Sequence, residues 1–158
     1  MAPWADVLYA TDGGWWHQYG QEASDKFQGA MYGYNGNGAK FGAIKVLGDV
    51  GRGGLHPEPG KVYSQGNSGG ALIHFARNNG ARRIILLGYD FAFTGGQFHW
   101  HGKHEGSLGN AGSIKNWFPH MRKLAADLKA EGVEVLNCSR VTALDCFDRR
   151  DLADALEC

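Results

Sequence analysis

The sequence predicts a single α/β domain of the Rossmann-like, three-layer kind, built on a mostly parallel sheet. Residues 83–87 form a continuous apolar run, Arg-Ile-Ile-Leu-Leu, which is typical of an inner parallel strand covered on both faces. Residues 114–128 follow with apolar side chains at helical spacing, and residues 133–136 supply the next strand. Strands that alternate with helices across short connections favour right-handed crossovers and a parallel sheet.

The amino-terminal half carries weaker signals for its elements. Residues 7–10 form a short apolar strand that ends in the Thr-Asp-Gly-Gly turn of residues 11–14. From residue 20 to residue 66 the hydrophobic periodicity is weak, and the strand candidates there are residues 43–47 and 62–64. We therefore expect long loops in this half of the chain.

The helices of the second half have clearer ends. A helix begins at Asn67 or Ser68, because either side chain can cap it, and it ends at Gly80. Residues 149–156 are expected to form a short terminal helix. The chain thus reads as one domain that covers residues 1–158.

Composition limits the classes of protein and partner. The 158 residues suffice for one compact core, and 43% hydrophobic with 20% charged residues is typical of a soluble globular protein. Sixteen basic residues balance sixteen acidic ones, so no net field attracts nucleic acid or an anionic membrane. No apolar run approaches the ~20 residues of a membrane span, and the first residues lack a secretion signal. We expect a cytoplasmic protein.

Glycine is the compositional anomaly, with 25 residues in the chain, about twice its usual share of ~7%. The turn before the second helix reads Gly66, Asn67, Ser68, Gly69 and Gly70. Backbone N–H groups at a helix start, with small residues around them, form a ready site for an anion or a cofactor phosphate. The same glycines also suit a tight turn and a close helix–sheet contact with nothing bound. The turn matches neither a Walker nor a dinucleotide fingerprint, so both readings stay open.

Three histidines, His99, His101 and His104, lie within six residues shortly after the strand that precedes Asp90. Imidazole suits proton transfer near neutral pH and also binds transition metals. Three interpretations are open. One histidine acts as a general base, or the three rings and Asp90 hold a divalent metal, or the histidines belong to a solvated loop without a function. The spacing matches no standard zinc framework, so metal binding is not favoured.

Two carboxylates follow predicted strands, Asp12 and Asp90. In open parallel sheets ligands bind beyond the carboxyl ends of the strands, where both aspartates and Ser68 are expected to meet. Asp90 is a candidate catalytic or ribose-binding group and Asp12 a secondary ligand-binding candidate. Each also fits the role of a cap or turn residue that accepts from nearby backbone amides.

Two sets of residues carry a family resemblance. Residues 66–90, from Gly-Asn-Ser-Gly-Gly-Ala to Ile-Ile-Leu-Leu-Gly-Tyr-Asp, resemble the shared core of MptE-like and motility-accessory-factor-like proteins. Residues 2–10, the pair Trp15 and Trp16, and the His-Trp-His-Gly-Lys-His stretch of residues 99–104 resemble a branch encoded by tailed phages and prophages. The resemblance covers most of the chain.

The resemblance implies a Rossmann-like sheet and a nucleotide or nucleotide-sugar site, because the superfamily includes a pterin pyrophosphokinase and proteins tied to transfer of nonulosonic acids. It also implies a phage-type protein that works in the cytoplasm of a host cell. Its relatives begin with a strand, a Gly-Pro-Ser turn and a second strand before the segment that matches residues 2–4. We expect this chain to be shortened there, without the loop best suited to a nucleotide phosphate.

These observations together predict a group-transfer enzyme, glycosyltransferase-like or pyrophosphokinase-like. In this hypothesis the turn at Ser68 holds an anionic group of a nucleotide-type ligand, Asp90 positions it, and His99, His101 or His104 supplies acid–base catalysis. Two alternatives stay open: a non-catalytic protein that sequesters a nucleotide or a host partner, and a metal-dependent hydrolase. A homodimer is expected if a shortened sheet leaves an edge that a second chain covers.

Overall fold

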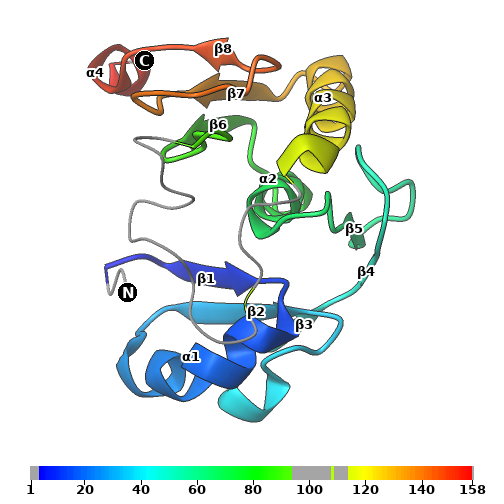
Figure 1. The fold of residues 1–158 in the computed structure, drawn as a ribbon, viewed down its shortest axis with the longest axis vertical. Helices are drawn as coiled ribbons and strands as arrows, with labels where there is room; N and C mark the ends of the chain where they lie inside the picture. The colour runs from blue at the N-terminus through cyan, green and yellow to red at the C-terminus, as the bar shows by residue number, and fades with distance from the viewer. Residues whose placement is uncertain (1–3, 94–107, 109–113, 158) are drawn as a thin grey trace.

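The computed structural model describes residues 4–93, 108 and 114–157 and consists of α-helices and parallel strand pairs (Figure 1). This confirms the α/β class. The strands are β1 (Val7–Ala10), β2 (Ala30–Tyr34), β3 (Ile44–Val46), β4 (Gly48–Asp49), β5 (Val62–Tyr63), β6 (Arg83–Leu86), β7 (Glu134–Asn137) and β8 (Asp148–Arg149). The helices are α1 (Gly13–Lys26), α2 (Ser68–Asn78), α3 (Ile114–Ala130) and α4 (Leu152–Leu156), with a 3₁₀ turn η1 (Ala39–Phe41).

The strands of the described residues form three separate hydrogen-bonded sheets. One has the order β1-β2-β3, another the order β6-β7-β8, and β4 pairs with β5. Every pair is parallel; Val7 lies opposite Ala30 in the first sheet, and Leu86 lies opposite Asn137 in the last. The parallel pairing agrees with the prediction. The division of the sheet does not follow from the sequence, because an apolar run reports burial and not which edges meet.

The first sheet is completed by elements that the sequence signals only weakly. Asp12 caps α1, which runs for 14 residues. The buried Trp16 on α1 donates from its indole Nε1 to the Ala10 carbonyl oxygen at 3.1 Å, which fixes α1 against β1. Strand β2 was not predicted, because its sequence Ala-Met-Tyr-Gly-Tyr lacks a clear alternation.

Helix α2 lies between the two larger sheets and packs against residues of both (Figure 1). On one side its Ile73 belongs to the main core cluster. On the other, Phe75 packs against Tyr9 of β1 and Tyr32 of β2, with ring centroids 5.3 and 4.7 Å apart. The buried members of the main cluster are Ile73, Leu86, Met121, Leu124, Leu128, Val133, Val135, Leu144 and Phe147. Both sheets thus depend on α2 for their packing.

The carboxyl-terminal part differs from the expectation in its detail. Residues 149–156 were expected to be one helix, but β8 takes Asp148–Arg149 and α4 begins at Leu152, with Asp151 as its cap. Helix α3 continues through Pro119 for 17 residues. Within the described residues, no helix combines the length and the apolar character that crossing a bilayer requires.

We predict that Leu124→Ala lowers the free energy of unfolding by about 2–5 kcal/mol, because it leaves a cavity in the main core, where Leu124 is fully buried. Urea denaturation followed by circular dichroism measures the change. The matched control is Leu87→Ala; Leu87 is 58% exposed, so the expected change is within about 0.5 kcal/mol. Equal losses in the two variants would contradict the assignment of this core.

Candidate functional site

The start of α2 is capped by Asn67. Its Oδ1 accepts from the Gly70 amide at 2.7 Å, and its Nδ2 donates to the Gln65 carbonyl oxygen at 3.1 Å. Of the two capping residues that the sequence offers, Asn67 therefore takes the role. Ser68 is the first residue of the helix, and its side chain makes a different contact.

The hydroxyl of Ser68 ties α2 to the end of β1. Its Oγ lies 2.6 Å from the Oγ1 of Thr11 and accepts from the Thr11 amide at 3.3 Å. The Nδ2 of Asn37 donates to the Thr11 carbonyl oxygen at 2.7 Å and holds the same turn from the other side. Because α1 begins at Gly13, two residues after Thr11, the starts of α1 and α2 meet at this point.

The sequence leaves two roles open for Asp12, ligand binding and helix capping, and in the structure Asp12 caps α1. Its Oδ1 accepts from the Gly14 amide at 2.7 Å, which satisfies one of the free donors at the start of α1. The side chain is exposed and adjoins Thr11. The structure thus brings Asp12 and Ser68 to one place, through the backbone and hydroxyl of Thr11.

The first amides of α2 are available to an anion. In the described part of the chain, the Ser68 and Gly69 amides have no acceptor, while the Gly70 amide is taken by the cap. The start of a helix carries a partial positive charge and attracts negative groups. This place can therefore hold a phosphate or a carboxylate.

Two glycines of the predicted turn are explained by the fold itself. Gly66 has a φ of 74°, in the left-handed region that glycine adopts without strain. A Cβ on Gly70 would lie 2.6 Å from the Gln65 side chain and 2.8 Å from the sulfur of Met121. Backbone conformation and close packing thus account for Gly66 and Gly70 without a ligand. The free amides of Ser68 and Gly69 are what indicates an anion site.

Tyr89, which follows β6, brings the end of that strand against α2. Its hydroxyl donates to the Gly69 carbonyl oxygen at 3.1 Å, and a Cβ on Gly69 would lie 3.0 Å from its ring. Its amide donates to the Ser139 hydroxyl at 2.7 Å. Burial raises the pKa of the Tyr89 phenol above its ordinary value, so it stays protonated. Sequence reasoning missed Tyr89 and singled out its neighbour.

Asp90 is half-buried beside Tyr89, and its carbonyl oxygen accepts from the Ala143 amide at 2.8 Å. No hydrogen bond or ion pair joins its carboxylate to another residue in the described ranges. The turn that presents it contains two left-handed residues, Gly88 at 74° and Phe91 at 49°. A non-glycine residue in this region is uncommon and is found often at functional sites.

A buried polar network supports this turn from β7. Asn137 is fully buried; its Oδ1 accepts from the Ser139 amide at 3.0 Å and its Nδ2 donates to the Thr142 hydroxyl at 3.2 Å. The Thr142 hydroxyl donates to the Tyr89 carbonyl oxygen at 2.7 Å. The sequence signal for this network is a single polar residue, Asn137, at the end of an apolar strand.

The histidine cluster cannot be placed with these groups. His99, His101 and His104 lie outside the described residues, so their roles stay predictions. Within residues 4–93, 108 and 114–157, no three His, Cys, Asp or Glu side chains are grouped to hold a metal ion. The convergence that the structure describes involves the ends of β1 and β6 and the starts of α1 and α2.

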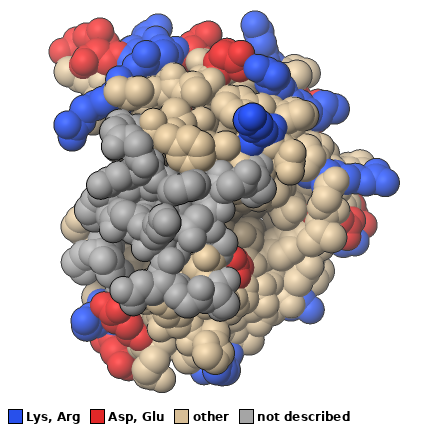
Figure 2. Space-filling view, in the orientation of Figure 1, with Lys and Arg blue, Asp and Glu red and all other residues tan. Residues whose placement is uncertain are grey.

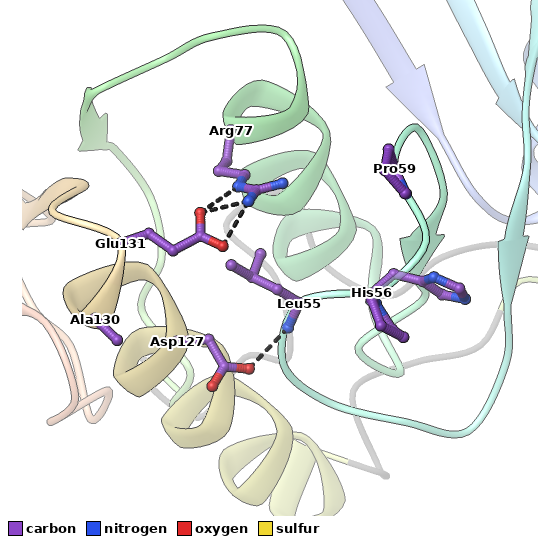
Figure 3. A pocket seen from close by; sticks show the side chains of 8 residues that line it. Leu55, His56, Pro59, Arg77, Asp127, Ala130 and Glu131 are labelled. Atoms are coloured by element: carbon purple, nitrogen blue, oxygen red, sulfur yellow. Dashed lines mark hydrogen bonds and ion pairs between the residues drawn. The ribbon is translucent and has the colours of Figure 1, made fainter.

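A cavity of about 390 Å³ lies beside Arg77, in the last turn of α2 (Figure 3). Arg77, in the last turn of α2, forms an ion pair with Glu131, which follows α3. The cavity is lined by Leu55, His56, Pro57, Pro59, Arg77, Asp127, Ala130 and Glu131. None of the predicted site residues that the structure describes lines this cavity.

Comparison of the chain with models of protein families, with curated proteins and with solved structures finds no match. The geometry of the described residues is therefore the basis for inferring a function.

Basic and acidic side chains lie next to one another along the rim of the face shown in Figure 2, in keeping with the balanced net charge.

We predict that Asn67→Ala lowers the free energy of unfolding by about 1 kcal/mol, because the Gly70 amide loses its cap. The matched control is Asn67→Asp, which keeps an oxygen acceptor at the same position and is expected to retain most of the stability. Thermal denaturation of the three proteins measures both changes. A control that is as unstable as the alanine variant would show that capping is not what Asn67 contributes.

Proposed function

We propose that the chain is a Rossmann-like domain that binds a nucleotide or a nucleotide-sugar through its phosphate at the start of α2 and transfers a group from it. The observation that carries the proposal is the 2.6 Å contact between Thr11 and Ser68, because it joins two helix starts at the end of β1. The orders β1-β2-β3 and β6-β7-β8 are consistent with two parallel halves of such a sheet. In doubly wound folds the ligand binds where the two halves meet.

The phosphate would be held by the Ser68 and Gly69 amides and by the Ser68 hydroxyl. Ser68 Oγ accepts from the Thr11 amide, and when Thr11 Oγ1 also donates to it, the Ser68 proton is left for the anion. The partial positive charge at the start of α2 favours the phosphate further. This arrangement binds the phosphate through neutral donors and needs no lysine or arginine.

Asp90 and the histidines would supply the chemistry around that phosphate. The Asp90 carboxylate, without a partner among the described residues, suits a ribose or sugar hydroxyl. His99, His101 or His104 would accept the proton of the acceptor hydroxyl as its oxygen bonds to the transferred group. The bond from that group to the phosphate breaks, and the nucleotide stays at α2 as leaving group.

The binding step is tested with Ser68→Asp. A carboxylate at this position interacts favourably with the helix start but repels a phosphate, so we expect a folded protein whose Kd for nucleotides rises at least tenfold. Isothermal titration calorimetry with UDP, CMP and their sugar conjugates measures the change, with inorganic phosphate as the minimal probe. The control Ser68→Thr keeps the hydroxyl that bonds to Thr11 and faces the phosphate, and it is expected to bind within about threefold of the natural chain. Unchanged binding in Ser68→Asp, or no binding by the natural chain, would refute the proposal.

The transfer step is tested by its pH dependence. A neutral imidazole is needed as base, so turnover of the nucleotide-sugar that binds is expected to fall about tenfold per pH unit below about 6.5. Chromatography of the nucleotide product at pH 5 to 8 measures it, with binding measured at each pH as the control. A flat profile would refute the role of the histidines. A ligand recovered intact would instead identify a non-catalytic binding protein, and turnover abolished by a chelator would identify a metal-dependent enzyme.

A further inference from the structure

Residues 53–60, Gly-Gly-Leu-His-Pro-Glu-Pro-Gly, form a strap between β4 and β5 that lies across α2 and α3 (Figure 3). Gly54 and Gly60, near its two ends, have φ values of 90° and 80°, in the left-handed region. Pro57 and Pro59 between them restrict the backbone of its middle. The strap therefore has a stiff centre between two glycines in the left-handed region.

Side chains from the helices and from the turn before α2 hold the first half of the strap in place. The Gly54 amide donates to Gln65 Oε1 at 3.1 Å, and Gln65 Nε2 donates back to the Gly54 carbonyl oxygen at 2.7 Å. The Leu55 amide donates to Asp127 Oδ2 on α3 at 2.9 Å. The position of the strap therefore depends on what these side chains can accept.

His74 on α2 is the second titratable acceptor of this set, beside the Asp127 carboxylate, and it is fully buried. The His56 amide faces its Nε2 at 3.2 Å, and the Tyr63 amide faces its Nδ1 at 3.2 Å. A neutral imidazole has one bare nitrogen and accepts from one amide at a time, whereas an imidazolium has none. Protonation would therefore leave both amides facing an N–H group.

The charges around His74 come from both helices and from the strap. Burial, and then Arg77 on α2 and His56 of the strap, lower its pKa to about 4, while Glu131 after α3 and Asp127 on α3 oppose this shift. The ring of Tyr63 on β5 lies against it edge-on, with centroids 6.4 Å apart. The imidazole is therefore neutral in the closed arrangement at neutral pH.

We propose that the strap is an acid-operated flap: proton uptake by His74 releases the His56 amide, and the strap swings about Gly54 and Gly60 away from α2 and α3. Leu55, His56, Pro57 and Pro59 form one wall of the 390 Å³ cavity, so the movement removes this wall and widens the opening of the cavity to solvent. The ring of His56 is held at both nitrogens. Its Nδ1 accepts from the Glu58 amide at 3.0 Å within the strap, and its Nε2 donates to Asp49 Oδ2 on β4 at 2.9 Å, a contact that must also break when the strap swings. The device is independent of the function proposed for the start of α2.

The pH range of the flap follows from the two protonation states. In the open strap His74 is solvated and has its ordinary pKa of about 6.5, whereas in the closed strap it is about 4. The open form therefore binds more protons between these values. The closed form has its full stability above pH 6.5 and loses it as the pH falls toward 4, so the opening constant rises by about tenfold per pH unit in this window.

Amide hydrogen exchange of the full chain, followed by NMR at pH 7 and pH 5 and corrected for intrinsic rates, tests the flap. The Leu55 and His56 amides are expected to open about twentyfold more often at pH 5. The amides of Leu124 and Leu128 in α3 are expected to exchange far more slowly at both pH values, because the opening is local. The proposal would be overturned if the strap amides had the same opening constant at both pH values. It would also be overturned if they exchanged no faster than the amides of α3.

The control is His74→Gln, which keeps one acceptor at the buried position but does not titrate, so its strap is expected to open equally at both pH values. His17→Gln, at an exposed position on α1, is expected to keep the pH dependence of the natural chain. If His74→Gln does not fold, the ring resonances of His74 in the natural chain decide: a midpoint near pH 4 supports the flap. A midpoint near pH 6.5, or an unchanged pH dependence in His74→Gln, overturns it.

Discussion

The packing of α2 between the two larger sheets is the constraint on which the rest of the structure depends. The sheets β1-β2-β3 and β6-β7-β8 share no backbone hydrogen bond among the described residues, so side chains of α2 must hold them together. Phe75 packs on the aromatic rings of the first sheet, Ile73 enters the core of the second, and Ser68 bonds to the end of β1. Because burial of large apolar side chains stabilises a domain far more than one hydrogen bond does, the Ser68 contact positions the helix and the core retains it.

The elements that could be predicted are those with a clear apolar pattern. Residues 84–87 form an unbroken apolar run, residues 133–136 are apolar except for the exposed Glu134, and the spacing of α3 is regular, so their type is clear from the sequence. Strand β2 is different, because it holds Gly33 in its middle. A Cβ there would lie 1.5 Å from the Asn37 carbonyl oxygen, so the close return of the chain requires a glycine where strand propensity is otherwise expected. A tertiary contact of this kind leaves no periodic pattern.

Some residues of the candidate site can be recognised from their neighbours in the sequence, whereas others depend on contacts between distant parts of the chain. Asn67 and Ser68 stand just before an apolar helical run, and Asp12 stands before a helix, so their places at helix starts could be predicted from neighbouring residues. Thr11 could not be predicted, because its partner is 57 residues away along the chain. Tyr89 could not be predicted for a related reason. A tyrosine at the end of a strand is usually interpreted as a core residue, and only the packing of β6 against α2 brings its hydroxyl to Gly69.

The buried polar residues explain how a chain with 25 glycines keeps its loops in one arrangement. Glycine loses more backbone freedom on folding than other residues, so glycine-rich loops need additional contacts to become ordered. The described buried polar residues are Gln65, His74, Asn137 and Ser139, and each bonds to the backbone of a loop. Each such bond contributes on the order of 1 kcal/mol, but an unsatisfied partner in the interior costs more. The loops are therefore held in place because the buried side chains need their backbone groups as hydrogen-bond partners. In the proposal for His74, protonation removes the acceptor for the His56 amide of the strap, and the position of the strap changes with it.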